Sequence, residues 1–267
     1  MSVAYSFTNY GGSIRNLRFV GFDNYIRAFT SSRFHNSLFV TVKFVVVSVI
    51  LQVSLGLVFA LILNTGIRGK QFFRSVIFLP TVISTIAVAL TFMIIFHPQH
   101  GHANTLLEYL GWNPQPWLTS AKTAMPTIII VVVWQSFGYY MVLFLSGLQT
   151  INASLYEAAD IDGANGLQKL TGITIPLLTP ITFFCVIMAV IRAFQVFDHI
   201  FIMTGGQYGG GPAGSTTVLV FDIYMDAFSA YQIGYASSKS VILLAIVLAI
   251  TIFQYRRQNK WVNYDAA

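Results

Sequence analysis

Charged residues are scarce in this sequence. They occupy 9% of its 267 positions, whereas hydrophobic residues occupy 55% and the mean hydropathy is +0.69. A soluble domain usually carries about 25% charged residues, and a water-soluble fold of this size could not bury so much apolar surface. The scarcity of charge therefore excludes an ordinary soluble protein and predicts a chain that is solvated by lipid.

Cysteine is almost absent. The single residue, Cys185, lies in the apolar run 183–186, so the chain can build neither a disulfide framework nor a cysteine-based metal site. The first residues lack a basic start followed by an apolar core, so we expect no signal peptide. The net charge is +6, but the lysines and arginines are scattered between apolar runs rather than clustered on one face, which argues against nucleic-acid binding.

Long apolar runs are abundant. A helix needs about 20 apolar residues to cross the hydrocarbon core of a bilayer, and no run shows the period-two alternation of a transmembrane barrel. Five runs qualify: residues 37–63, 75–96, 125–147, 173–203 and 233–255. We therefore expect an all-α integral membrane protein, with one transmembrane domain over residues 1–267 and its membrane core over 37–255.

The basic residues between these runs predict an orientation. Lys122 stands alone on one side, against seven on the other. The seven are Arg68, Lys70, Arg74, Lys169, Arg256, Arg257 and Lys260. Since lysine and arginine favour the cytoplasmic side, we expect a multi-pass protein of the bacterial cytoplasmic membrane with a cytoplasmic C-terminus.

The N-terminal segment runs against this count. Four arginines of this segment would lie on the outer side with Lys122: Arg15, Arg18, Arg27 and Arg33. The count of basic residues would then be seven on the cytoplasmic side against five outside. Within this segment, residues 20–36 are expected to form a helix lying on the membrane surface. Its apolar face would carry Phe22, Tyr25, Ile26 and Phe29.

The loop 148–172 holds the most informative pattern. Ser154 and Glu157 match a capping box, Gly163 suits a left-handed turn, and Pro176 suits the first turn of a helix. The pattern predicts two short helices joined by a turn at the membrane surface. Taken alone, it is also compatible with a passive connector.

This loop resembles the EAA loop of importer-type ABC permeases. The matching residues are Glu157, Ala158, Ala159, Asp162, Gly163, Ala164, Ile173 and Pro176. Ile175 stands where that family usually has leucine. Three further stretches narrow the resemblance to sugar permeases of the maltose-transporter type: residues 19–25, residues 73–74 with 78–80, and residues 194–198 with 204–206. The first span of that family ends near residues 6–10, so the resemblance implies that this chain lacks it.

The resemblance implies a permease subunit of an ATP-driven importer for a sugar or sugar-like solute, with glycerol phosphate or another small polar solute as alternatives. It implies a second, similar permease, two ATPase subunits that receive the loop, and an external solute-binding protein. The chain has no Gly-x-x-x-x-Gly-Lys-[Ser/Thr] phosphate loop, so we expect no catalytic residue and no cofactor. From other classes, a stand-alone ion-coupled carrier and a membrane enzyme remain as alternatives.

Polar residues inside apolar runs are candidates for the solute path. We single out Gln135, Tyr139, Gln195 and Arg192, since aromatic planes and amides are suited to sugars. The last two share a helical face with His199 if residues 173–203 form one helix. His97, His100 and His102 suggest a metal site, but Pro98 and Gly101 favour an ordinary turn, so we expect no metal.

Overall fold

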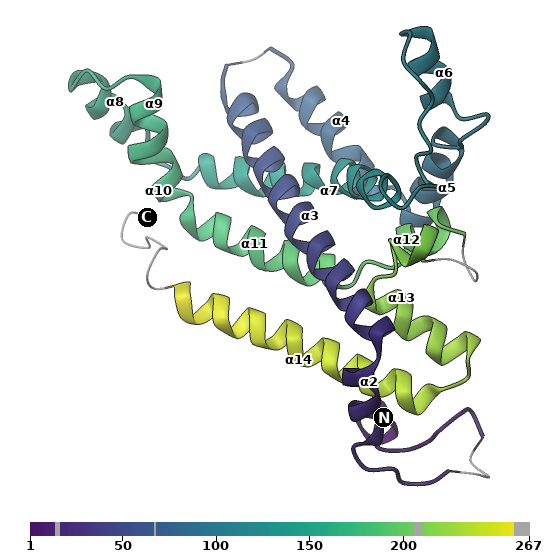
Figure 1. Ribbon diagram of the computed structural model, residues 1–267. Helices are drawn as coiled ribbons and strands as arrows, with labels where there is room; N and C mark the ends of the chain where they lie inside the picture. Colours follow the sequence, from purple (N-terminus) through teal and green to yellow (C-terminus); the bar gives the residue numbers. More distant parts are fainter. Residues whose placement is uncertain (14–16, 67, 206–209, 259–267) are drawn as a thin grey trace. The chain divides into compact units, whose positions relative to one another are not determined.

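The computed structural model describes residues 1–13, 17–66, 68–205 and 210–258, and the chain is built of helices (Figure 1). Apart from the four-residue α1 (Ser2–Tyr5), the N-terminal half contains α2 (Asp23–Thr30), α3 (Ser32–Asn64), α4 (Lys70–Val82), α5 (Thr85–Ile95), α6 (His102–Tyr109) and α7 (Ala124–Leu148). The second half contains α8 (Ala153–Ile161), α9 (Gly166–Lys169), the π-helical η2 (Leu170–Thr174), α10 (Ile175–Leu177), α11 (Thr179–Phe194), α12 (Asp198–Met203), α13 (Leu219–Tyr224), the π-helical η5 (Met225–Ser229) and α14 (Ile233–Arg257).

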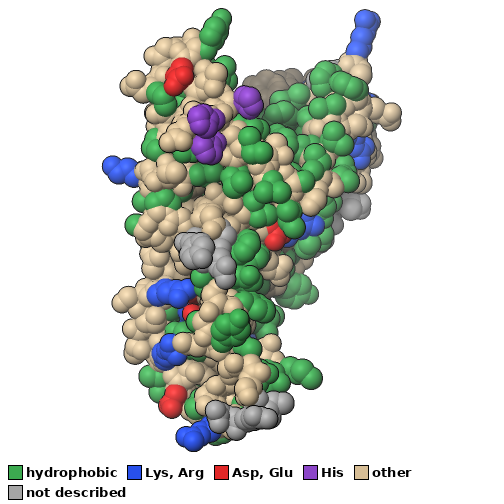
Figure 2. Space-filling view, turned by 90° about the vertical axis from the view of Figure 1, so that its right-hand side faces the viewer, with side chains coloured by type: hydrophobic (Ala, Val, Ile, Leu, Met, Phe, Trp, Pro, Cys, Tyr) green, Lys and Arg blue, Asp and Glu red, His purple; other side chains and the backbone are tan. Residues whose placement is uncertain are grey.

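Three of these helices, α3, α7 and α14, are long and apolar enough to cross a membrane. Two sharply bent pairs raise the number to as many as five if each pair is one span: α4 with α5, and the helix 166–177 with α11. The all-α class is confirmed. On the face shown in Figure 2, apolar side chains are widespread and charged ones are few.

Two of the five runs were wrongly predicted as continuous helices. The run 75–96 is interrupted at Ile83 and Ser84, whose backbones are not helical. The run 173–203 is interrupted at Leu178 and again at residues 195–197. Pro80, inside α4, and Pro176, in the first turn of α10, each lack a backbone N–H, but neither stands at a break itself.

The chain forms two compact units, each described here by itself. Unit 1 comprises Met1–Val47, Ser84–Val132 and Arg192–Ala249. Unit 2 comprises Ser48–Ile83, Val133–Ile191 and Ile250–Ala267. The long helices α3, α7, α11 and α14 each contribute residues to both units.

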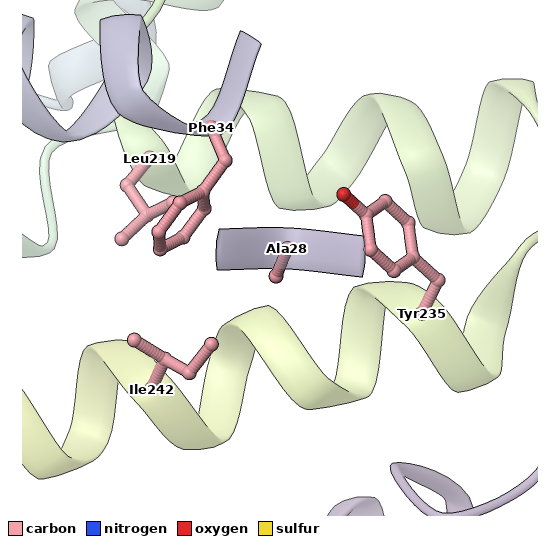
Figure 3. Close-up of a cluster of buried hydrophobic side chains, with 5 residues drawn as sticks. All are labelled: Ala28, Phe34, Leu219, Tyr235 and Ile242. Atoms are coloured by element: carbon pink, nitrogen blue, oxygen red, sulfur yellow. The ribbon is translucent and has the colours of Figure 1, made fainter. Parts of the chain in front are cut away.

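A buried apolar cluster in unit 1 joins α2, the start of α3, α13 and α14 (Figure 3). Its buried members are Ala28, Phe34, Leu219, Tyr235 and Ile242. Ala28, Phe34 and Leu219 are at most 1% exposed. Burying apolar surface against a shared core fixes the short helix α2 to its three neighbours.

A network of four charged side chains lies next to this cluster. Lys239 of α14 is 1% exposed; it pairs with Asp222 of α13, and its Nζ lies 2.6 Å from Asp226 Oδ2 in η5. Arg33 at the start of α3 closes the network, with Nε 2.5 Å from Asp222 Oδ1 and Nη1 3.4 Å from Asp226 Oδ1. Two positive and two negative charges balance, as charges removed from water require.

Glycines allow α7 to approach its neighbours closely in unit 2. A Cβ on Gly138 would collide with the backbone carbonyl of Ile77 in α4. One on Gly56 would lie 2.7 Å from Tyr140 Cβ, and one on Gly147 would lie 2.7 Å from Ile181 Cγ1 of α11. Small residues at such crossings are the usual means by which membrane helices pack.

Gln135 of α7 holds the end of α4. Its Nε2 donates to the Ile83 carbonyl at 3.1 Å, and Thr81 Oγ1 donates to the Gln135 carbonyl at 3.0 Å. The break after α4 leaves backbone groups without helical partners, and side chains must satisfy them at membrane depth. The side chain of Gln135 therefore stabilises the interrupted span.

We expect Lys239→Met to destabilise the protein strongly, because it leaves two buried carboxylates facing one arginine. The free energy of unfolding should fall by about 3–5 kcal/mol, measured by thermal or denaturant unfolding in detergent. The double variant Lys239→Met/Asp222→Asn restores one charge against one and should recover most of the loss. Lys169→Met is the matched control; its partner Asp160 is 63% exposed, so it should cost about 0–1 kcal/mol. Equal losses for the two single variants would contradict a buried network.

Gly138→Ala should also destabilise, because neither the α7 backbone nor the Ile77 carbonyl can move aside freely. An overpacked contact of this kind costs about 1–3 kcal/mol. Gly172→Ala is the control, since a Cβ there meets nothing within 4 Å. The same unfolding measurement should leave that variant unchanged or slightly more stable, and an unchanged Gly138→Ala would show that α4 and α7 do not touch.

Candidate functional site

The loop between α7 and α11 begins with a capped helix. Asn152 is the N-cap of α8, and its Oδ1 accepts a hydrogen bond from the Ser154 N–H at 3.0 Å. The prediction that Ser154 caps this helix with Glu157 as its capping-box partner was therefore wrong by two residues. Asn and Ser are equally good N-caps, so which of the two caps α8 depends on where α7 ends and how many residues connect the two helices.

Gly163 makes the turn, as predicted. Its φ is +74°, and it follows the C-cap Asp162 directly. The Ala164 N–H donates to the Ala159 carbonyl at 2.8 Å, and the Gly163 N–H donates to the backbone carbonyl of Asp160 at 3.1 Å. These bonds close α8 in the manner of a glycine-terminated helix. A Cβ at Gly163 would meet nothing within 4 Å, so the positive φ, and not a lack of space, is what favours glycine here.

The second arm has the capping box that was expected in the first. Asn165 Oδ1 accepts from the Gln168 N–H at 3.0 Å, and Gln168 Oε1 accepts from the Asn165 N–H at 2.7 Å. Beyond α9 the chain continues through the π-helical η2, and Pro176 then occupies the first turn of α10, as predicted.

Two contacts tie the arms together. Lys169 Nζ lies 2.5 Å from Asp160 Oδ1, and the hydroxyls of Tyr156 and Thr174 lie 2.9 Å apart. At the base, Gly147 packs on Leu178 and Ile181, so the end of α7 and the start of α11 are also joined. The loop is thus a braced two-helix element, seen beyond the ends of α7 and α11 in Figure 1. Such an element can transmit a displacement rather than absorb it.

The surface of this element is largely exposed. Of the residues that resemble the EAA loop, Glu157, Ala158, Asp162 and Gly163 are exposed, while Ala159, Ala164, Ile173 and Pro176 are half-buried. The exposed apolar side chains are Leu155 at 40%, Ile161 at 88%, Leu167 at 70% and Ile175 at 43%.

Sequence reasoning missed Ile161 and Leu167 as candidate contact residues. Their signal was available, since both are large apolar residues close to the predicted turn at Gly163. Exposed apolar side chains on a rigid support are characteristic of a protein-binding surface.

The solute-path candidates in unit 2 are Gln135 and Tyr139. Gln135 is 6% exposed, and its amide is bonded to the Ile83 carbonyl. Tyr139 is half-buried, with its ring edge-on to Tyr140 at 5.3 Å between centroids.

The candidates in unit 1 do not share a helical face. Arg192 lies in the last turn of α11, which ends at Phe194, and Gln195 lies outside the helix. His199 belongs to α12 and is 7% exposed, whereas Arg192 and Gln195 are exposed. The assumption of one helix over 173–203 was wrong, so the spacing argument for these residues fails; their exposed side chains still qualify them as candidates.

The histidines after α5 serve the turn. His97 Nδ1 accepts from the backbone N–H groups of Gln99 and His100 at 3.3 and 3.2 Å, and the two histidine rings stack at 5.6 Å. Among the residues that the structure describes, no three His, Cys, Asp or Glu side chains are placed to hold a metal. The glycine-rich stretch from Gly205 is only partly described, since 206–209 lie outside the described residues.

Residues 52–262 match the family model of the binding-protein-dependent transport system inner membrane component. The trehalose/maltose transport system permease protein MalF of Thermococcus litoralis is 39% identical, over 88% of this chain and 78% of that protein. The sn-glycerol-3-phosphate transport system permease protein UgpA of Rhizobium meliloti is 36% identical, over 92% of this chain and 83% of that protein.

Solved structures give the same fold. A bacterial ABC transporter involved in the import of the acidic polysaccharide alginate has a chain that superposes with a TM-score of 0.85 at 21% identity. The match covers 98% of this chain and 89% of that one. The alginate transporter in complex with an alginate pentasaccharide-bound periplasmic protein gives 0.81 at 22% identity, over 90% and 83% of the two chains.

Proposed function

Since the chain belongs to the family of binding-protein-dependent transport system inner membrane components, we propose that it imports a sugar or sugar-like solute delivered by an external binding protein. Its relatives carry names that mention trehalose, maltose and glycerol phosphate, so a glycerol phosphate or another small polar solute is the second candidate. As a multi-pass permease subunit of an ABC importer, the chain supplies the passage for the solute.

The observation that carries the coupling proposal is the braced loop with an exposed apolar surface. We propose that Ile161, Leu167 and Ala158 enter a cleft of an ATPase subunit and that Glu157 meets a basic group there. Closure of the ATPases would then push on Asp162–Ala164 and on the arm that includes Ile173 and Pro176. The Gly147 contact would pass that displacement to α7 and α11 together.

ATP hydrolysis is assigned to a separate partner. The sequence contains no phosphate-binding loop of the Gly-x-x-x-x-Gly-Lys-[Ser/Thr] type. We propose an assembly with a second permease, two ATPase subunits and an extracytoplasmic solute-binding protein. A stand-alone ion-coupled carrier would have no use for a braced, apolar loop of this kind.

For the solute path we retain Gln135, Tyr139, Gln195 and Arg192, with different roles. The ring of Tyr139 offers a face for the C–H surface of a sugar, and the exposed Gln195 and Arg192 offer donors for hydroxyl or anionic groups. Gln135 acts by holding the end of α4, since its amide already donates to Ile83.

A substitution that disturbs the turn at Gly163 should weaken the binding of the proposed ATPase subunit to the loop. Gly163→Val places a β-branched residue at φ +74°, which costs about 1–2 kcal/mol and lowers the population of the native turn about 5–30-fold. Gly163→Asn is the matched control, because asparagine tolerates this conformation. The measurements are ATPase retained on purification and solute uptake per membrane-resident permease.

Ile161→Ser tests docking without touching the turn. The side chain is 88% exposed, so the membrane level of the permease should be unchanged while ATPase retention falls. Normal transport by both Gly163→Val and Ile161→Ser would reduce the loop to a passive connector and remove the main support for the proposal.

The proposed orientation places the loop and the C-terminus in the cytoplasm. In a Cys185→Ala background, Gly166→Cys should react with an impermeant thiol reagent only after the membrane is opened. Gly166 is exposed, and a Cβ there meets nothing within 4 Å. Asn113→Cys, also at an exposed position, should react in intact cells. The reverse pattern would invert the topology.

A further inference from the structure

The short helix α2 has two faces of different character. Its inner face carries Ala28, which is fully buried against Phe34, Tyr235 and their neighbours (Figure 3). Its outer face carries the N-cap Phe22, Ile26 and Phe29, which are 67%, 61% and 57% exposed. The single helix predicted over residues 20–36 was wrong, since the chain breaks at Ser31, and Tyr25, predicted on the same face, instead packs against the buried cluster. Phe22, Ile26 and Phe29 lie at i, i+4 and i+7, so they form one stripe along the helix.

The inner face is fastened by specific bonds. Asn24 Nδ2 donates to the carbonyls of Ser6 and Thr8, each at 2.9 Å, and the Tyr25 hydroxyl lies 2.7 Å from Ser6 Oγ. The Arg27 guanidinium lies 4.1 Å from the centre of the Tyr235 ring. These bonds prevent α2 from rotating to bury its outer face, so the apolar stripe is a fixed feature of the surface.

The position of α2 along the chain indicates what covers the stripe. Only Ser31 separates it from α3, whose 33 residues form the most apolar of the candidate spans. On α3, Phe39 is 67% exposed, and Val42 and Val46 follow at 44% and 51%. Helix α2 therefore directly precedes a candidate membrane span that itself carries exposed apolar side chains near its start.

We propose that α2 is an interfacial anchor whose outer face, Phe22, Ile26 and Phe29, inserts among the lipid acyl chains beside α3. Helices of this kind place their apolar face about 5–10 Å into the boundary between headgroups and acyl chains. Because α2 shares its core with α3, α13 and α14, the anchor sets the depth of these three helix ends in the membrane.

The charges around α2 make the insertion apolar rather than electrostatic. Arg27 is stacked on Tyr235, and Arg33 is paired with Asp222 and Asp226. Neither guanidinium needs an acidic headgroup for a partner. The anchor should therefore work in a zwitterionic bilayer. The inference requires a chain that spans the membrane, and it is independent of which solute is carried.

A spin-label experiment on the complete transporter tests the anchor. In a Cys185→Ala background, nitroxides are attached to Ile26→Cys and, as control, to Asp23→Cys, and the transporter is reconstituted in phosphatidylcholine vesicles. Both positions are exposed, so folding should survive. The label at 26 should collide with oxygen and not with nickel-EDDA, at a depth of about 5–10 Å. The label at 23 should show the opposite preference.

Two results at position 26 would overturn the anchor: access to nickel-EDDA, which means water, or access to neither reagent, which means a covering protein. Adding phosphatidylglycerol should leave the depth unchanged, and a deeper label in the acidic bilayer would overturn the apolar basis of the insertion. Solute uptake by the same vesicles tests the proposed function separately, since uptake can succeed or fail whatever the depth of the label.

Discussion

Polar groups carried into hydrocarbon must find their partners within the protein, and this constraint shapes the whole chain. It accounts for the Lys239 network, in which two buried carboxylates balance a buried lysine and the half-exposed Arg33. It also accounts for Gln135, whose amide satisfies a carbonyl at the break after α4. In each case a polar side chain on one helix sets the position of a neighbouring segment.

Different contacts hold the helices within each of the two units. In unit 1, charge pairs and a small apolar cluster fix α2, α13 and the start of α14. In unit 2, backbone approaches at Gly56, Gly138 and Gly147 bring α7 against its neighbours. Close backbone packing resists deformation, which suits the unit that contains the loop proposed to dock in the ATPase.

The elements predictable from sequence were those with local causes. Apolar length identified the spans, and Gly163 identified the turn because positive φ is a property of one residue. The interruptions at Ile83 and at 195–197 were missed, because what stabilises a break is a partner elsewhere, such as Gln135. Lys239 was overlooked inside an apolar run, although a lysine there with Asp222 and Asp226 upstream is itself a signal of a buried network.

Arg27 and Arg33 have partners in the folded protein that explain their presence in the N-terminal segment. In the proposed orientation, Arg27 and Arg33 oppose the preference of basic residues for the cytoplasmic side. Their partners, Tyr235, Asp222 and Asp226, come about two hundred residues later in the chain, so they cannot mask this charge while α3 is being inserted. The two arginines are therefore unfavourable for topology and favourable for the folded state. A chain that keeps them needs a larger excess of basic residues on the other side, and the loops around Arg68 and Arg256 supply it.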